Sequence, residues 1–540
     1  MPKVTITYKD YAVGAAEAAT GTSAGAESFC DPADLFGGAD IPRFATLEDD
    51  LWQLDGSWPL FPETPAAAAL GIWSAALSGS GGAFAAAQEV DIVLSANFSG
   101  TGITLFFDPN SDARPATVKV TWFRDSTQLA SADYVPDSDV YFCRQTVASY
   151  NKIVLIFPAM AAANRRLRLS RVVFGRVKVF QPQEYKDLAM KQLADPISDT
   201  VEDNPMTVTL RPGNDGCDYL FQAKQPLSVA EGTELIGVWY IDTHDETGVN
   251  AYDITAIGLK GLLDRQSNHM GGIYNGTAAS VVCADILGSI PYVLDSSLRD
   301  VPVYGWLPIA SPRDNLLQLA FRLGAIVDDS RHDYISIRPP ETGSATDALT
   351  GPRAYEKGKI STSSMVTTVY LTVHRYAVSS ETEQLFSGTL TGTERVEFSE
   401  PHSGLTISGG TIGSSGANYA VITGTGGTVT LTGYKYIHTT SVISKSNPLR
   451  TASDTENPRK AENMTLISPN DAAERLAALY DYYLRVRTVK GKFVTNGNYP
   501  GQRVTVDAAT GKTLTGNIVS VDWKISANQA AEMEILCDAE

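Results

Sequence analysis

The stretch VDIVLSANF (Val90–Phe98) alternates apolar and polar residues, and four stretches of the same kind follow it. They are GITLFFD at 102–108, TVKVTWF at 117–123, KIVLIF at 152–157 and LRLSRVVF at 167–174. Alternation with a period of two is typical of strands, and the breaks between these stretches carry turn residues, such as SGTG at 99–102 and DPNSD at 108–112. Residues 85–180 are therefore predicted to form a β-sandwich of the jelly-roll type.

Outside this sandwich the chain has strand-like patterns with few helical ones. The predicted fold is mainly β and multidomain, with a jelly-roll-like β-sandwich, small β-barrels and a few short helices. The predicted segments are an N-terminal arm or latch at 1–84, the sandwich at 85–180, a barrel with two helices at 181–345, a small all-β insertion of short hairpins at 346–460, and a helix with closing strands at 461–540.

Two segments share a helix-start motif. SPRD at 311–314 and SPND at 468–471 each place Ser as the N-cap, Pro at the first helical position and Asp three residues past the cap. Gly324 follows an apolar helical face and is predicted to end the first of these helices.

The latch prediction depends on FATLEDDLWQLDGSW at 44–58, hereafter the latch stretch. It is too short to form a core of its own but apolar enough to anchor a segment on a neighbouring domain. Its large apolar residues are Leu47, Leu51, Trp52, Leu54 and Trp58.

Composition excludes several functions. With 43 basic and 61 acidic residues the net charge is −18, which disfavours binding to phosphates. The five cysteines are scattered and form no CxxC pair, so we expect free thiols and no zinc site. The N-terminus lacks a signal-peptide core, and the apolar stretch at 65–77 is too short to span a bilayer. We expect a chain made as a soluble cytoplasmic protein, without a membrane anchor.

No catalytic or cofactor motif is found, so we predict a protein that is not an enzyme and has no cofactor or metal. The acids at 48–50 and at 328–329 are adjacent rather than facing, and we expect solvated loop carboxylates. His244-Asp245-Glu246 is the densest polar cluster and is expected in a solvated, hairpin-like turn rather than at a metal.

Aromatic residues on the sandwich suggest one binding function. Trp122, Tyr134 and Tyr141 lie on or beside its strands and either belong to the core or form a platform on which a sugar stacks. The basic run at 164–171 alternates, so Arg166 and Arg168 point to one face, either solvated or paired with the acidic surface of a partner.

Several short stretches of the sequence, hereafter patches, are similar to stretches of one known family of proteins. The latch stretch resembles a signature near the start of tail-tip proteins in phages and prophages of Gram-positive bacteria. The same proteins carry stretches similar to QPLSV at 225–229, LIGVWYID at 235–242, GLLDR at 261–265, YGWLPIASPRD at 304–314, NYPGQRV at 498–504 and TGNIV at 515–519.

This resemblance implies a baseplate hub in the virion, a homotrimer that closes and extends the tail tube. Its partners would be the distal tail protein and tail tube, the tape measure protein and other baseplate or receptor-binding proteins, and DNA would pass through it during genome ejection without being specifically bound. The sandwich resembles carbohydrate-binding modules, which would add a host-surface carbohydrate as a ligand for host attachment. The alternative function is a carbohydrate-binding adhesin or receptor-binding protein without catalysis, against which the missing signal peptide argues. A polysaccharide-degrading tailspike would show long β-helical repeats, and none are found.

Overall fold

The computed structural model describes residues 4–37, 43–46, 48–53, 55–61, 70–111, 114–194, 201–213, 219, 221–525 and 530–539. Strands make up 57% of it and helices 10%, which confirms the prediction of a mainly β, multidomain protein with few short helices. The chain forms two compact units. The larger unit comprises Met1–Ile6, Gln181–Arg211 and Ser228–Glu540, and the smaller unit comprises Thr7–Phe180 and Pro212–Leu227.

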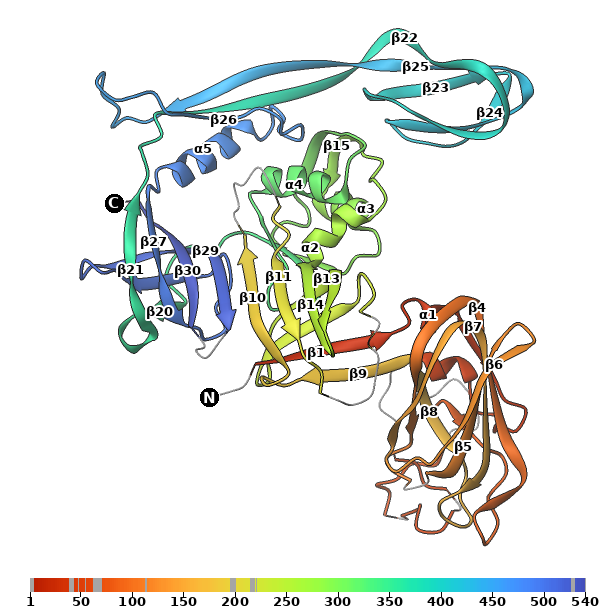
Figure 1. The fold of residues 1–540 in the computed structure, drawn as a ribbon. Helices are drawn as coiled ribbons and strands as arrows, with labels where there is room; N and C mark the ends of the chain where they lie inside the picture. The colour runs from red at the N-terminus through yellow and green to blue at the C-terminus, as the bar shows by residue number, and fades with distance from the viewer. Residues whose placement is uncertain are drawn as a thin grey trace. The chain divides into compact units, whose positions relative to one another are not determined.

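The smaller unit contains one seven-stranded sheet with the order β3-β8-β4-β7-β5-β6, in which β2 also pairs with β4 (Figure 1). Its core is a continuous cluster of buried side chains from these strands, including Ile92, Leu105, Val120 and Leu155. The strands are β2 (Ala19–Thr22), β3 (Ile72–Trp73), β4 (Ala83–Phe107), β5 (Pro115–Arg124), β6 (Thr127–Tyr134), β7 (Val140–Met160) and β8 (Arg168–Val173).

The expected turn at 99–102 is instead part of β4, which runs unbroken through it. The pairing of β4 with β7 shifts register at Gly100 and Gly102, so the glycines make bulges rather than a reversal. Gly102 has a φ of 142°, and a Cβ there would lie 2.3 Å from the carbonyl oxygen of Cys143. Glycine is therefore required for the close approach of the two strands, not for a turn.

The large sheet has the order β21-β27-β30-β29-β10-β11-β14-β13-β12-β1-β9, with β28 on β29 and β20 on β28. The first strand of the chain, β1, belongs to this sheet, although it lies in the segment expected to be an irregular arm. Its sequence, VTITYKDY, forms a strand because buried residues alternate with more exposed ones. The strands are β1 (Val4–Tyr11), β9 (Gly175–Phe180), β10 (Tyr185–Leu193), β11 (Pro205–Leu210), β12 (Pro226–Glu231), β13 (Glu234–Gly248), β14 (Ala251–Gly258), β20 (Asp347–Leu349), β21 (Ala354–Thr362), β27 (Arg487–Val494), β28 (Arg503–Asp507), β29 (Thr513–Ile525) and β30 (Ala530–Cys537).

Helices and two small sheets complete the core of the larger unit. Helix α4 (Pro312–Leu323) begins as predicted, because the Ser311 hydroxyl accepts a hydrogen bond from the Asp314 N–H at 3.1 Å, and Gly324 ends it with a φ of 62°. The other elements are α2 (Leu259–Leu262), η3 (Leu263–Arg265), α3 (Ala279–Leu287), β15 (Gly272–Ala278) with β17 (Pro302–Leu307), and β16 (Tyr292–Leu294) with β19 (Ile335–Arg338) and β18 (Ile326–Asp328).

Helix α5 (Ala472–Tyr483) begins later than predicted, with Asp471 rather than Ser468 as its N-cap residue. The Asp471 carboxylate turns back to accept from the Ser468 N–H at 3.0 Å and from its hydroxyl at 2.9 Å. It also lies 2.8 Å from Arg322 in a buried ion pair. Ser468 therefore closes the turn before the helix instead of capping the helix itself.

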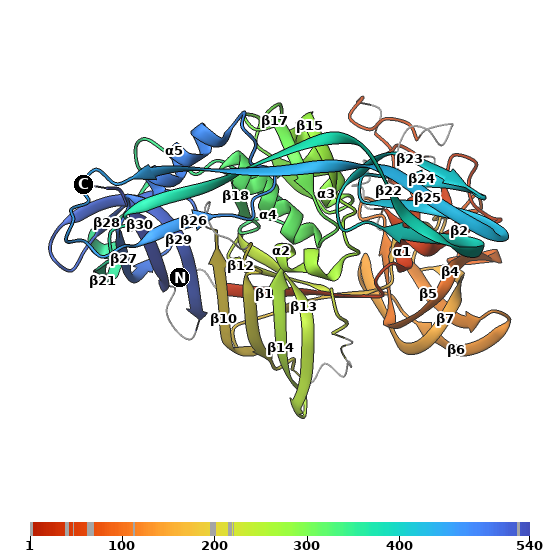
Figure 2. The same ribbon diagram turned by 90° about the horizontal axis from the view of Figure 1, so that it is seen from above.

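The segment expected to form short hairpins is dominated by two long strands, β22 (Thr368–Glu397) and β25 (Tyr419–Ser446), hereafter the long hairpin. They pair antiparallel from Thr368–Ser446 to Glu397–Tyr419 and run side by side in Figures 1 and 2. Strands β23 (His402–Ser408) and β24 (Gly410–Ser415) pair with β25, and β26 (Pro458–Ala461) pairs with β22.

Candidate functional site

The three residues proposed to contact carbohydrate do not form one surface. Trp122 is 1% exposed and belongs to the core of the smaller unit, so the core alternative applies to it and a sugar cannot reach its ring. Tyr134 and Tyr141 are half-buried neighbours whose ring centroids lie 6.4 Å apart at 64°. The Tyr134 hydroxyl donates to the carbonyl of Arg144 at 2.7 Å. A sugar contact at these two tyrosines stays a prediction.

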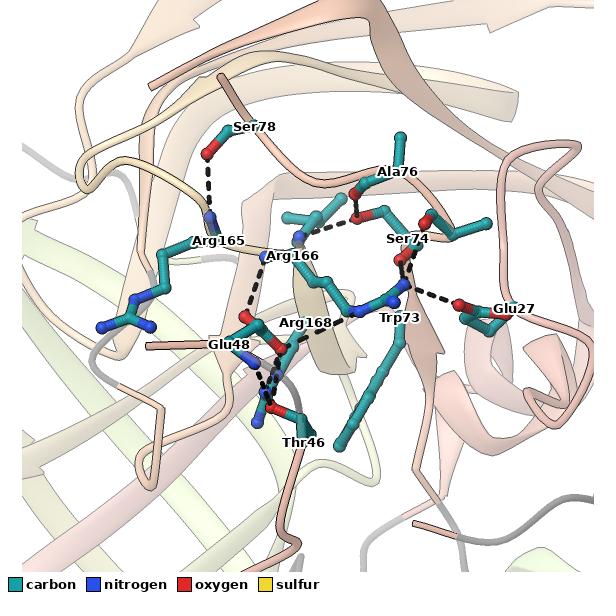
Figure 3. A network of polar contacts seen from close by, with 12 residues as sticks. Glu27, Thr46, Glu48, Trp73, Ser74, Ala76, Ser78, Arg165, Arg166 and Arg168 are labelled. Atoms are coloured by element: carbon teal, nitrogen blue, oxygen red, sulfur yellow. Dashed lines mark hydrogen bonds and ion pairs between the residues drawn. The ribbon is translucent and has the colours of Figure 1, made fainter. Parts of the chain in front are cut away.

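The carboxylate of Glu48 lies at the centre of a buried polar network (Figure 3). Glu48 is 2% exposed, so the expectation that it is a solvated loop acid is wrong. It forms an ion pair with Arg168, whose other guanidinium nitrogen lies 2.9 Å from Asp108 Oδ2. The Arg168 guanidinium also lies 4.2 Å from the centroid of the Trp73 ring. A buried cation is thus neutralised by two carboxylates and covered by an indole.

Arg166 extends this network on the same face of the chain, as the alternating basic run predicts. Its backbone N–H donates to Glu48 Oε2 at 3.0 Å, and its guanidinium donates to Glu27 at 2.6 Å and to the carbonyl of Ser74 at 2.7 Å. Arg166 and Arg168 therefore pair with acids of their own chain. No spacing rule points to Glu48 as the partner, because it lies 118 to 120 residues away in sequence.

The same network fixes the latch stretch to the smaller unit. Phe44 and Phe61 contact Trp73, each with 6.3 Å between ring centroids, while Trp52 is 53% exposed. Leu51 is buried, whereas the predicted anchors Leu47 and Leu54 lie outside the described residues. The latch is thus held by a buried carboxylate and flanking phenyl rings, and Trp52 does not anchor it.

The second pair of acids, Asp328 and Asp329, is also buried rather than solvated. Asp328 Oδ2 lies 3.0 Å from Arg338 Nη2. Asp329 lies 3.8 Å from Lys260 Nζ and accepts from the backbone N–H of Lys260 at 3.0 Å. Burial raises the pKa of Asp329 above its ordinary value, and Lys260 partly offsets that effect. Each carboxylate is paired with its own cation, Asp328 with Arg338 on β19 and Asp329 with Lys260 on α2.

The structure places the polar cluster at 244–246 in a strand. His244 lies within strand β13, paired opposite Ile254, and not in a turn. In the part of the chain that is described, no three His, Cys, Asp or Glu side chains converge as metal ligands, and no helix is long and apolar enough to cross a membrane.

Burial raises the pKa of the Cys30 and Cys537 thiols to about 11, which disfavours reactive thiolates. Cys217 lies outside the described residues.

Comparison with known proteins gives structural neighbours only. No protein-family model matches the chain, and no curated protein matches it. A 43 kDa tail protein of prophage MuSo2 from Shewanella oneidensis is 11% identical with a TM-score of 0.42, over 67% of this chain and 97% of that one. A tail protein from Neisseria meningitidis MC58 is 10% identical with a TM-score of 0.40, over 67% and 94%. The prophage tail protein gp18 from Listeria monocytogenes EGD-e is 12% identical with a TM-score of 0.36, over 66% and 90%. At the level of the whole chain these similarities are weak.

Proposed function

We propose that this chain is a structural subunit of a phage tail tip, a baseplate hub that closes and extends the tail tube as a homotrimeric ring. The observation that carries the proposal is where the tail-tip-like patches lie. The latch stretch lies in the smaller unit, whereas the other patches fall on the large sheet, on β17 of a small two-stranded sheet and on nearby helices: 225–229 at β12, 235–242 on β13, 261–265 on α2 and η3, 304–314 from β17 into α4, 498–504 before and into β28, and 515–519 on β29.

The large sheet supports a ring assembly because its path ends on β9, which pairs with one neighbouring strand among the described residues, whereas β21 at the other end is also bridged at Gly358 to Ala508. On β9, Val177 is 50% exposed and Val179 is 42% exposed. A soluble protein normally covers or charges such an edge, since exposed strand edges recruit other chains. Symmetric copies around an axis provide that cover. The number three comes from the family resemblance.

The charge of the chain supports a passive channel. A net charge of −18 gives little opportunity for counterion-release binding to a phosphate backbone. DNA would then pass through the ring without being held. The distal tail protein above the ring and receptor-binding proteins around it are the partners that this role requires.

Electron microscopy of the parent particle tests the hub directly. We expect three-fold density of this chain at the end of the tail tube, and a native mass of three times 57.9 kDa for the purified assembly. A single copy on the side of the tail, or on a fibre, would contradict the hub and favour the adhesin alternative.

A substitution at the free edge tests how the ring forms. Replacing Val177 and Val179 together with Lys adds charge to a half-exposed edge, so the trimer should dissociate while the melting temperature of the monomer stays unchanged. The matched control is Val93→Lys on β4, because Val93 is 49% exposed but does not lie on that edge. An unchanged trimer in the double variant would show that β9 is not an assembly edge.

A further inference from the structure

A hollow of about 530 Å³ lies between the β15–β17 pair and the base of the long hairpin, within the larger unit. Its wall is unusually rich in tyrosine for a chain of this composition. The residues that matter for its chemistry are Tyr274, Tyr304, Tyr376, Tyr436, His374 and Arg375.

The wall of this hollow is held rigidly by stacked rings. The Tyr376 ring stacks on His438 with 4.5 Å between centroids and an angle of 5°, and its other neighbour is Trp306 at 6.0 Å. His438 Nε2 lies 3.0 Å from His374 Nδ1, and His374 Nε2 lies 3.1 Å from the carbonyl of Glu462. Because a carbonyl only accepts, His374 carries its proton on Nε2, and His438 Nε2 donates to Nδ1 when His374 is neutral. A preformed wall loses little entropy when a ligand binds.

The polar groups of the hollow favour an anion. Although the chain carries a net charge of −18, no Asp or Glu is found among the described residues that line the hollow. Arg375 is exposed, and no ion pair or hydrogen bond to another described residue is found for its guanidinium. The Tyr376 hydroxyl is buried and its ring stacks on His438, so Tyr376 shapes the wall rather than contacting a ligand. The Tyr274 hydroxyl, by contrast, is occupied, since it donates to Asp285 at 3.3 Å.

We propose that this hollow binds a saccharide unit that carries an anionic group, either a carboxylate or a phosphate. The half-buried rings of Tyr304 and Tyr436 offer apolar faces to the C–H side of a sugar ring, and their hydroxyls bind its oxygens. The side chains of Asn275 and Asn470 supply further donors and acceptors at the exposed rim. Arg375 binds the anionic group with its planar fork of N–H donors. The inference stands on the hollow alone and does not require the hub assembly.

An acidic peptide fits this wall less well. Peptide partners normally add to a free strand edge or seat an apolar side chain in a groove. Here β22 and β25 already pair with each other, with Tyr376 opposite His438. The side chains that remain available are aromatic faces, amides and one guanidinium, which suit a compact polyhydroxylated ligand.

Saturation-transfer NMR on the full chain tests the proposal with glucuronic acid and glucose 6-phosphate, which separate the carboxylate from the phosphate. Glucose and inorganic phosphate are the reference probes. We expect at least one of the two acidic sugars to receive saturation on its ring protons and to bind about ten-fold more tightly than glucose. Arg375→Gln should weaken that binding about ten-fold, and Tyr304→Ala should abolish the saturation of the ring protons.

The matched control is Arg459→Gln, because Arg459 is an exposed arginine on β26 beside the same hairpin but outside the hollow. It should leave the affinity unchanged, and melting curves should show that Arg375→Gln, at an exposed position, retains the fold. The proposal is overturned if neither acidic sugar binds, if glucose binds equally well, or if Arg375→Gln and Arg459→Gln behave alike. Tighter binding of inorganic phosphate alone, or of a short poly-glutamate peptide, would also overturn it in favour of a simple anion site or a peptide site.

Discussion

Replacing Glu48 with Gln is the sharpest test of the latch. The substitution keeps the shape of the side chain and an oxygen for the Arg166 N–H, but it removes the negative charge that faces Arg168. Both side chains of the ion pair are almost fully buried, at 1% exposed for Glu48 and 3% for Arg168. Removing one partner of a buried ion pair typically costs about 3–5 kcal/mol, because the remaining charge stays buried without compensation.

The expected cost lies at the lower end of that range, about 3 kcal/mol, because Asp108 still lies 2.9 Å from Arg168. For a unit of this size, each kcal/mol of lost stability lowers the melting temperature by about 2–4 °C, so the smaller unit should melt at a temperature about 6–12 °C lower. Calorimetry measures the shift, and limited proteolysis within residues 43–61 identifies the transition as that of the latch.

The control for this experiment is Asp49→Asn, in the same stretch. Asp49 is exposed, and its backbone oxygen, not its carboxylate, accepts from Arg165. The reasoning is refuted if Glu48→Gln melts like Asp49→Asn. A further check is the double variant Glu48→Gln with Arg168→Met, which also removes the unpaired cation. It should lower the free energy of unfolding by less than the sum of the two single changes.

Four other results are expected. Ser311→Ala removes the N-cap of α4 and should destabilise the larger unit by about 0.5–2 kcal/mol in denaturant unfolding, and an unchanged midpoint would contradict the cap. Ser468→Ala should cost less in the same assay, because its hydroxyl closes a turn outside α5. Burial, with His438 nearby, lowers the pKa of His374 below its usual 6.5. The contribution of neutral His374 to stability is therefore complete above pH 6.5 and should be lost as the pH falls below that value. His374→Gln should flatten this pH dependence of the melting temperature, and an equally steep dependence in the variant would exclude His374 as its source. Tyr134→Ala and Tyr141→Ala should each abolish any glycan-array signal of the smaller unit, and a signal that survives both would rule out that pair as the sugar contact.

Local features of the fold were predictable from the sequence because they depend on neighbouring residues. The start of α4 follows from Ser311, Pro312 and Asp314 within one turn, and the glycine that ends it follows from the need for a positive φ. The burial of Trp122 could also be predicted from the sequence. It shares strand parity with Val118 and Val120, both fully buried, so alternation alone places its ring on the core face.

Features that depend on distant residues were not predictable in this way. The acidic run at 48–50 predicts a solvated Glu48, because the sequence does not show that its partner Arg168 comes from a strand 120 residues later. The glycines at 100 and 102 predict a turn as readily as a bulge, since both require the same residue type. In the long hairpin, Gly- and Thr-rich stretches suggested repeated reversals, whereas pairing across 26 registered residue pairs keeps both strands extended.

The position of β1 in the large sheet has a consequence for how the chain is made. Its two neighbours in the sheet are β9 and β12, so its last partner strand ends at Glu231. At about 5–20 residues per second, a ribosome takes roughly 10–45 s to pass from β1 to that point. During this interval Ile6 and Tyr8, both fully buried in the finished fold, have no partner strand on the β12 side. Newly made chains in a crowded polysome are therefore expected to depend on a holding chaperone until β12 emerges, and to aggregate through residues 4–11 when translation stalls before it.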